Sequence, residues 1–334
     1  WNEARALTIT SQQMPLWPGT GDPSERGAHD NVLNVPLAPR SGGAEMRAAY
    51  SMFAPYKDRR KVSIFGSART DRNEPIYQKC VTFSRQLVRL GYMVITGGGP
   101  GIMQAGNEGA GAENSFAVNI RLPFEQGTNP VMENSGRTIT YQYFFNRKVA
   151  FLKEADAVAL FPGGFGTLDE SFELLTLIQT GKSDLHPVIM IEAPGTGFWG
   201  PWAEFVDTLV GQGMIAADDL NLFTVTTSLD EAIDEIRSFY AVYHSQRYVE
   251  GDLVLRLTSE PSDAVVEELN EQFSDIVRTG QIVKIGPTPA ELASDDHVDL
   301  PRLRFRFDRR QFGRLRCLID HLNGMDRPVQ STPQ

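Results

Sequence analysis

Residues 161–171 read FPGGFGTLDES and directly follow an apolar run at 155–160. They contain three glycines in four positions, then a threonine and an acidic pair. Glycine admits positive φ angles and lets a ligand approach the main chain with no Cβ in the way. A helix that starts after such a turn points free N–H groups and its positive end at the turn, where an anion such as phosphate fits. The stretch therefore predicts an anion-binding turn with a carboxylate beside it.

The same residues also have an interpretation without a ligand. Thr167 and Glu170 have the S/T-x-x-E spacing of a capping box, in which the hydroxyl caps a helix and the carboxylate reaches back to the first N–H. Asp169 and Glu170 would also favour the positive end of a helix without any function. On spacing alone, the cap and the anion site explain the stretch equally well.

Two further glycine turns follow apolar runs. Gly66 and Ser67 follow the run at 61–65, and the GGGPG turn at 97–101 follows the run at 92–95. Continuous apolar strands that alternate with helical stretches indicate a parallel sheet covered on both faces. We predict a doubly wound, Rossmann-like α/β fold, whose ligands bind at the carboxyl ends of the strands. The remaining strands are expected at 115–120, 155–161, 187–191 and 222–225, and the helices at about 74–90, from 102, 141–154, 167–180, 199–213 and 228–242.

The two ends of the chain differ from this central part. Residues 1–60 are rich in Pro, Gly and polar side chains without a sustained period, so we predict an N-terminal arm. Residues 61–244 would form the Rossmann-like domain, and residues 245–334 a small α+β accessory unit that resembles a ferredoxin-like or ACT-like half. In that unit we expect strands at 252–257, 281–285 and 303–307, and helices at 261–278 and 310–322. An interaction or regulatory role for the unit is a hypothesis.

Bulk composition excludes several classes of function. The 334 residues carry a net charge of −10 and no basic tract, which argues against a nucleic-acid polymer as partner but permits a single nucleotide. Cys80 and Cys317 are far apart and the five histidines are scattered, so neither a disulfide scaffold nor a metal site is expected. No run of about 18 apolar residues is present and the N-terminus lacks the pattern of a signal peptide, so we expect a cytoplasmic protein with no membrane span.

Several motifs together resemble the LOG ("Lonely Guy") family of nucleoside 5′-monophosphate phosphoribohydrolases, often labelled "lysine decarboxylase-like". PGGFGTLDE at 162–170 is similar to the family's PGGxGTxxE signature, and the resemblance covers about 60–240 in the expected order. The other matching stretches are 65–67 (FGS), 97–103 (GGGPGIM), 105–110 (AGNEGA), 122–126 (LPFEQ) with Asn129-Pro130, and Arg147-Lys148 at the place of the family's RK pair.

The resemblance implies hydrolysis of an N-glycosidic bond, through an oxocarbenium-like ribose, to free base and ribose 5-phosphate. Glu170 would stabilise that cation or activate water, with Arg147 as its partner, and this pairing is expected to keep Glu170 ionised near neutral pH. No metal or organic cofactor is needed. A homodimer or higher homo-oligomer is also implied. The implied substrate-binding residues are Ser67, Gly98, Gly99, Met103, Lys148, Gly163, Gly164, Gly166 and Thr167, with the 5′-phosphate on the 163–167 turn and Met103 at the base.

Three alternatives remain open from the sequence. Relatives on the same fold bind nucleotides or molybdenum cofactor without hydrolysing them. A true lysine decarboxylase would need a pyridoxal phosphate lysine, and Lys148, Lys153 and Lys182 have no flanking pattern for one. A Rossmann dehydrogenase would need a GxGxxG turn, which is absent after Gly66. The best-known LOG branch has Met-His where this chain has Phe144-Phe145, so bases other than cytokinins are also candidates.

Overall fold

The computed structural model of the protein describes residues 39–122 and 127–324. Residues 1–38 of the predicted N-terminal arm and residues 123–126 of the LPFEQ stretch lie outside the described residues.

Seven strands within the described ranges form one parallel sheet in the order β4-β3-β2-β1-β5-β6-β7. The strand order reverses between β1 and β5, which is the point where a doubly wound sheet opens a crevice for a ligand. This sheet confirms the predicted Rossmann-like fold. The strands are β1 (Lys61–Phe65), β2 (Met93–Thr96), β3 (Ser115–Ile120), β4 (Thr138–Tyr141), β5 (Ala157–Leu160), β6 (Val188–Ile191) and β7 (Thr224–Thr226).

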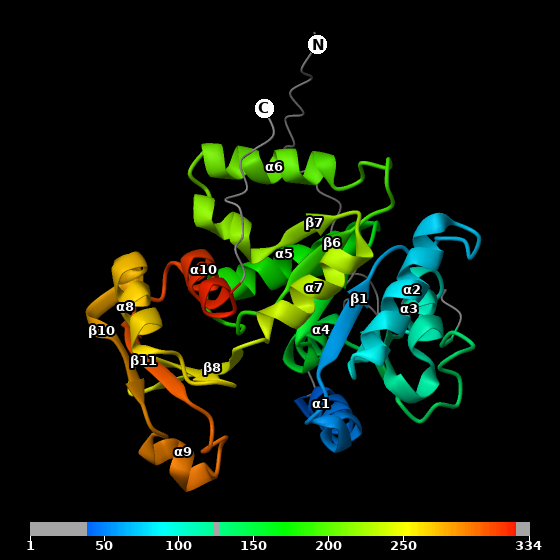
Figure 1. The fold of residues 1–334 in the computed structure, drawn as a ribbon. Helices are drawn as coiled ribbons and strands as arrows, with labels where there is room; N and C mark the ends of the chain where they lie inside the picture. Colours follow the sequence, from blue (N-terminus) through cyan, green and yellow to red (C-terminus); the bar gives the residue numbers. More distant parts are fainter. Residues whose placement is uncertain (1–38, 123–126, 325–334) are drawn as a thin grey trace, which may run out of the picture. The chain divides into compact units, whose positions relative to one another are not determined.

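Helices pack on both faces of the sheet (Figure 1). One apolar layer joins the strands to α2 (Pro75–Arg89), α3 (Ile102–Ala110) and α7 (Leu229–Phe239). The other joins them to α4 (Phe144–Glu154), α5 (Phe165–Gln179) and α6 (Gly200–Gly211). Because both faces are covered, every residue of β1, β2, β5 and β6 is buried, which is why apolar residues predominate in these strands.

Two elements of this region were not predicted. Helix α1 (Pro39–Phe53) lies in the part of the chain for which no regular element was expected. Its residues Ala49 and Phe53, one turn apart, are buried, and the Phe53 ring lies 4.4 Å from that of Phe116. Strand β4 was missed because only Tyr141 of its four residues is buried, so it has no apolar run. Both elements depend on contacts with distant residues rather than on a local pattern.

The C-terminal part differs from its predicted order. Its four described strands form an antiparallel sheet in the order β10-β11-β9-β8, which opens with a β8–β9 hairpin and not with a strand, helix and strand as in a ferredoxin-like half. The predicted helix 261–278 ends at Gln272, and β10 begins at Val277. Strand β8 and helix α9 were missed. The elements are β8 (Tyr243–Val249), β9 (Asp252–Leu257), α8 (Asp263–Gln272), β10 (Val277–Ile285), α9 (Pro289–Ser294), β11 (Arg302–Phe307) and α10 (Phe312–Leu322).

Helix α10 ties this antiparallel sheet to the Rossmann-like domain. Arg316 of α10 is buried and pairs with Glu235 of α7 at 2.6 Å and with Asp320 at 2.8 Å. Leu315, Leu318 and Ile319 of α10 belong to the same apolar cluster as α5. No helix in the described ranges is long and apolar enough to cross a membrane.

Candidate active site

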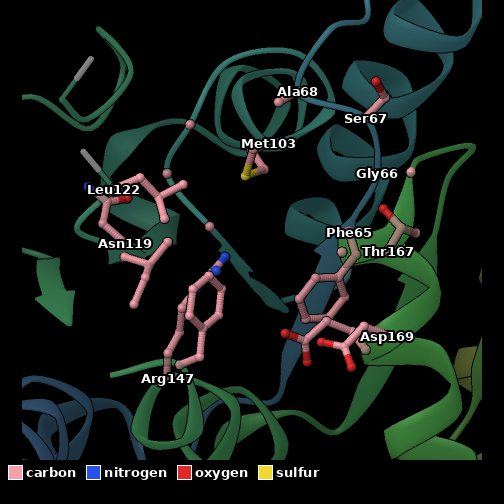
Figure 2. A pocket seen from close by; sticks show the side chains of 18 of the residues that line it. Phe65, Gly66, Ser67, Ala68, Met103, Asn119, Leu122, Arg147, Thr167 and Asp169 are labelled. Atoms are coloured by element: carbon pink, nitrogen blue, oxygen red, sulfur yellow. The ribbon is translucent and has the colours of Figure 1, made fainter. Parts of the chain in front are cut away.

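A cavity of about 950 Å³ opens at the carboxyl ends of β1, β2, β3 and β5 (Figure 2). It therefore lies beside the point where the strand order reverses. Of the sequence-predicted site residues, the cavity wall contains Ser67, Gly98, Gly99, Met103, Arg147, Gly164, Gly166, Thr167 and Glu170. Lys148 and Gly163 are not part of this wall.

The FPGGFGTLDES stretch is a strand-to-helix turn without a capping box. Helix α5 begins at Phe165 with Gly164 as its N-cap, and no side chain caps it. Thr167 is the third helical residue, so it cannot be the cap, and that interpretation of the sequence is wrong. Residues 164–167 all line the cavity, so the first turn of α5, with its free N–H groups, borders the space that an anion would fill.

Gly163 lies outside the cavity wall and packs closely against Thr167 and Gly66. A Cβ at Gly163 would lie 2.2 Å from Oγ1 of Thr167 and 3.0 Å from the carbonyl carbon of Gly66. Only glycine therefore lets the turns after β1 and β5 pack together at this point. The Ser67 N–H donates to the carbonyl oxygen of Pro162 at 3.0 Å and joins the same two turns. Gly163 is thus a packing residue of the cavity and not a part of its wall.

The GGGPG turn after β2 is held by a buried polar network. Asn107 accepts hydrogen bonds at its Oδ1 from Thr96 Oγ1 (2.8 Å) and from Asn129 Nδ2 (2.9 Å). The Asn129 N–H donates to the carbonyl oxygen of Gly98 at 2.7 Å. Gly98 itself has a φ of 72°, and a Cβ there would lie 1.9 Å from Oδ1 of Asn119. This network explains why the AGNEGA stretch and the Asn129-Pro130 pair accompany the glycine turn.

Arg147 enters the cavity from α4. Its Nε donates to the carbonyl oxygen of Val118 at 3.0 Å, which fastens the side chain to the end of β3. Figure 2 shows its guanidinium pointing toward the middle of the cavity, with Met103 on the opposite side. A Cβ at Gly97 would lie 2.6 Å from both Nη2 of Arg147 and Sδ of Met103. Only glycine at this position therefore leaves room for both side chains.

Glu170 is buried in the cavity wall, and its charge state differs from the expectation. Burial raises the pKa of its carboxyl from the usual 4.5 to about 7, against the opposing effects of Lys148 and Arg147. The expected full ionisation near neutral pH is therefore wrong, because desolvation outweighs the nearby cations. Lys148 lowers the pKa of Glu170 more than Arg147 does. Lys148 pairs with Asp169 at 2.7 Å and also with Glu173, so it holds α4 against α5.

Comparisons with known proteins agree with this architecture. A family model described as "Possible lysine decarboxylase" matches residues 101–236. The cytokinin riboside 5′-monophosphate phosphoribohydrolase LOG of Oryza sativa subsp. japonica is 26% identical over 191 residues, which is 55% of this chain and 75% of the relative. A second such phosphoribohydrolase, from Arabidopsis thaliana, is 25% identical over 162 residues, or 47% of this chain and 73% of the relative. These matches confirm the resemblance to the LOG family.

Two solved structures are also similar to this LOG-like chain. The molybdenum cofactor carrier protein of Chlamydomonas reinhardtii has 18% identity and a TM-score of 0.37, with 54% of this chain and 96% of that chain covered. DNA processing protein A of Helicobacter pylori has 18% identity and a TM-score of 0.37, with 54% and 81% covered.

Several residues of the cavity were not assigned to the site from the sequence. The wall also contains two further arginines, Arg69 and Arg121, and the amide of Asn119, whose Nδ2 donates to Thr128 Oγ1 at 2.7 Å. The strand at 115–120 was predicted, but no turn signal follows it, so no site was predicted at its carboxyl end. Ligands in such a sheet bind at the carboxyl ends of the strands, so the residues that follow each strand could have been predicted as site residues. Of the other wall residues, eight lie in motifs named from the sequence but without a site role, namely Phe65, Gly66, Gly97, Leu122, Phe144, Phe165, Leu168 and Asp169, whereas Ala68, Ile120, Gly127, Thr128 and Thr140 were not singled out.

The pKa of Glu170 predicts a pH-dependent stability. The folded state holds this proton more tightly than the unfolded chain, so stability from the group is present below about pH 4.5 and is lost as the pH rises through about 7. One pKa unit corresponds to about 1.4 kcal/mol, so a rise from 4.5 to about 7 gives a loss of at most about 3.5 kcal/mol. Thermal unfolding of wild type and Glu170→Gln at pH 5 and pH 8 checks this. The variant should gain in Tm relative to wild type at pH 8, and an equal difference at both pH values would contradict the assignment.

Proposed function

We propose that this protein is a hydrolase that cleaves the N-glycosidic bond of nucleoside 5′-monophosphates. The observation that carries the proposal is the buried Glu170 carboxyl, with a pKa of about 7, in the same cavity as the first turn of α5. This reaction needs a site for the anionic 5′-phosphate and a carboxyl group that can gain or lose a proton near neutral pH. The names of the relatives, which are cytokinin riboside 5′-monophosphate phosphoribohydrolases, support the same reaction class.

In the proposed complex the 5′-phosphate lies on residues 164–167 at the start of α5. The ribose then lies beside Glu170, one turn further along the helix, and the base extends toward Met103, Leu122 and Phe144. This order follows from chemistry, because the phosphate needs the N–H groups and the base needs the apolar part of the wall. Arg69 and Arg121 supply positive charge at the wall for the anionic substrate.

The proposed reaction consumes one water. The bond between ribose C1′ and the base nitrogen breaks, and its electron pair leaves with the base. Water forms the new bond to C1′ as Glu170 takes one of its protons. The base takes a proton from solvent and leaves as the neutral heterocycle, and Glu170 returns its own proton to solvent, so that the protons balance. The ionised Glu170 also stabilises the positive charge that develops on the ribose. Arg147, fastened to Val118, is placed to hold the substrate and to stabilise ionised Glu170.

The proposed base is a heterocycle that fits the apolar part of the cavity wall. Phe144 lines the cavity, and the ring of Phe145 packs on Tyr143 with 5.4 Å between centroids. Phe145 lies outside the cavity wall, and Phe144 cannot donate a hydrogen bond to a base, so shape and stacking would select the substrate at Phe144. Cytokinin ribotides, which the relatives' names specify, are one class that an apolar pocket accommodates, and purine nucleotides are another.

A panel incubation tests the proposal. Purified protein is incubated separately with AMP, GMP, IMP, CMP, UMP and isopentenyladenosine monophosphate, and free base is detected by chromatography. Base release from at least one nucleotide is the expected result and names the substrate class. Binding of a nucleotide in calorimetry with no base after prolonged incubation would contradict the hydrolase and favour a carrier.

We also propose that the chain forms a homodimer through an apolar surface on α4, α5 and α6. This surface consists of Phe144, Phe145 and Val149 of α4, Phe172 of α5 and Phe205 of α6, each more than one third exposed. The rings of Phe172 and Phe205 lie 6.3 Å apart, so the surface continues from one helix to the next. Adjacent exposed aromatic side chains are typical of an interface core.

Charged substitutions should separate the subunits of this dimer. Phe172→Asp combined with Phe205→Asp is expected to convert a dimer to a monomer, because a buried unpaired carboxylate is costly in an interface. Light scattering after size exclusion measures the mass. Leu292→Asp on α9, where the leucine is 59% exposed, is the matched control and should leave the mass unchanged. A monomeric wild type, or a double variant that stays dimeric, would contradict this interface.

A further inference from the structure

A second cavity, of about 650 Å³, lies at the opposite end of the same strands. Its wall includes Arg60, which precedes β1, and Asp156, which precedes β5. Leu185 and His186, just before β6, form another side. Tyr243, His244 and Ser245 at the start of β8 close it from the antiparallel sheet. The volume is that of a site for a small organic molecule.

The wall combines planar groups with an apolar surface. The Arg60 guanidinium lies over the Tyr240 ring at 3.4 Å from its centroid and pairs with Asp156 at 3.3 Å. The Tyr240 hydroxyl donates to the carbonyl oxygen of Asp156 at 2.7 Å, which fixes the ring. Leu152 and Leu177 supply aliphatic surface beside these groups. A ligand with a flat ring would find both stacking and apolar contact here.

The wall carries charges of both signs, with Arg60, Lys153 and Lys182 as its cations and Asp156 and Asp184 as its carboxylates. Lys153 and Lys182 both belong to the wall. The Lys153 side chain is 54% exposed, pairs with its neighbour Glu154 at 3.0 Å, and has its ammonium 4.3 Å from the centroid of the Tyr50 ring. The Lys182 ammonium makes no ion pair or side-chain hydrogen bond within the described ranges. Two such cations beside one cavity favour an anionic group of a ligand.

His186 adds an unsatisfied polar atom. Its side chain is 5% exposed, and Nε2 has no hydrogen-bond partner among the described residues. Burial lowers the pKa of this imidazole to about 4, while a hydrogen bond with the backbone of Asp184 opposes that change. His186 is therefore neutral at pH 7. Nε2 itself has almost no accessible surface, so a ligand in the cavity cannot bond to it in this arrangement, and His186 belongs to the wall without offering a polar contact.

We propose that this second cavity is a regulatory site for a small organic anion that carries a planar ring. The ring stacks on the Arg60 guanidinium beside Leu152 and Leu177, and the anionic group meets Lys153 and Lys182. The lysine ammonium groups can bind a phosphate or a carboxylate, so the binding experiment uses probes of both kinds.

The site is placed to influence the first cavity through shared helices. Helix α4 carries Phe144 and Arg147 in the first cavity and Leu152 and Lys153 in the second. Helix α5 carries Glu170 in the first, and its Leu177 lies in the second. A ligand that shifts the ends of both helices would change how Arg147 and Glu170 lie relative to each other. The expected effect on turnover rests on the proposed function, whereas ligand binding in the second cavity does not depend on it.

Calorimetry with the whole 334-residue chain tests the binding. ATP and GTP serve as phosphate probes, and indole-3-acetate and phenylpyruvate as carboxylate probes. At least one probe is expected to bind wild type and Glu170→Gln equally, and about tenfold more weakly to Lys182→Glu, a loss that corresponds to about 1.4 kcal/mol. Lys57→Glu, an exposed lysine outside both cavities, is the matched control and should bind like wild type. No binding by any probe, or equal binding by the Lys182 and Lys57 variants, would overturn the site.

Turnover measurements test whether a ligand in the second cavity regulates the reaction. A saturating probe is expected to change kcat/KM at least twofold in wild type and to leave Lys182→Glu unchanged. Binding at the Lys182 site with no change in turnover would overturn the regulatory role. If no nucleotide is hydrolysed at all, the proposed function fails, and the calorimetry still decides whether the site exists.

Discussion

Glu170→Gln is expected to lower turnover of the preferred nucleotide by about 10²–10⁴-fold while the nucleotide still binds. Gln has the size of Glu and keeps the packing of this buried side chain, but it can neither accept a proton from water nor carry the negative charge that stabilises the ribose cation. A loss confined to kcat would mean that the carboxyl acts in the transition state rather than in substrate binding.

Steady-state kinetics and calorimetry on the same preparations separate these effects. Glu173→Gln is the matched control, because Glu173 lies on the same helix and pairs with Lys148 but is not part of the cavity wall. Its turnover should stay within a few-fold of wild type. Full activity in Glu170→Gln, or an equal loss in both variants, would show that the carboxyl of Glu170 has no specific part in the reaction.

Gly164→Asp is expected to weaken binding of a phosphorylated substrate by about two orders of magnitude or more, because it places a negative charge at the N-cap where the phosphate would lie. The substitution should not disturb the fold. Gly164 has a φ of −87°, and a Cβ there meets no atom within 4 Å. Asp is also a preferred N-cap residue, so the helix itself should be slightly stabilised.

Gly164→Asn provides the matched control for charge. Asn has nearly the same size, is an equally good N-cap and is neutral, so it should retain much more affinity than Asp. Calorimetry with a non-hydrolysed nucleotide or with inorganic phosphate measures the difference, and thermal unfolding checks that Tm does not fall. Equal affinities in the Asp and Asn variants would mean that no phosphate binds at the start of α5.

The sequence predicts the parallel sheet well because its central strands are buried on both faces. The run at 187–191 has no polar face to confuse with a helix or a loop, and in the run at 61–65 the polar residues Lys61 and Ser63 are buried as well. The glycine turns are equally readable, since Gly97 and Gly163 each lie where a Cβ would collide with a neighbour. By contrast, β4 is an edge strand with one buried residue, and its place depends on β3.

The charge state of the site could not be predicted from the sequence. The resemblance to the LOG family implied that Arg147 pairs with Glu170, which suggested an ionised carboxylate. The pKa of about 7 arises from burial, which depends on how α4 and α5 close over the carboxyl. The same holds for His186, whose sequence context carries no signal and whose neutral state depends on the packing around β6.

The most direct test of the central claim is a single-turnover count of products. Protein in excess over the preferred nucleotide is quenched over time, and free base and ribose 5-phosphate are quantified by chromatography. The account predicts that both appear together in equal amounts until the nucleotide is consumed, and that Gly164→Asp produces neither at the same protein concentration. Recovery of the nucleotide intact from the wild-type protein would contradict the account and identify the chain as a carrier.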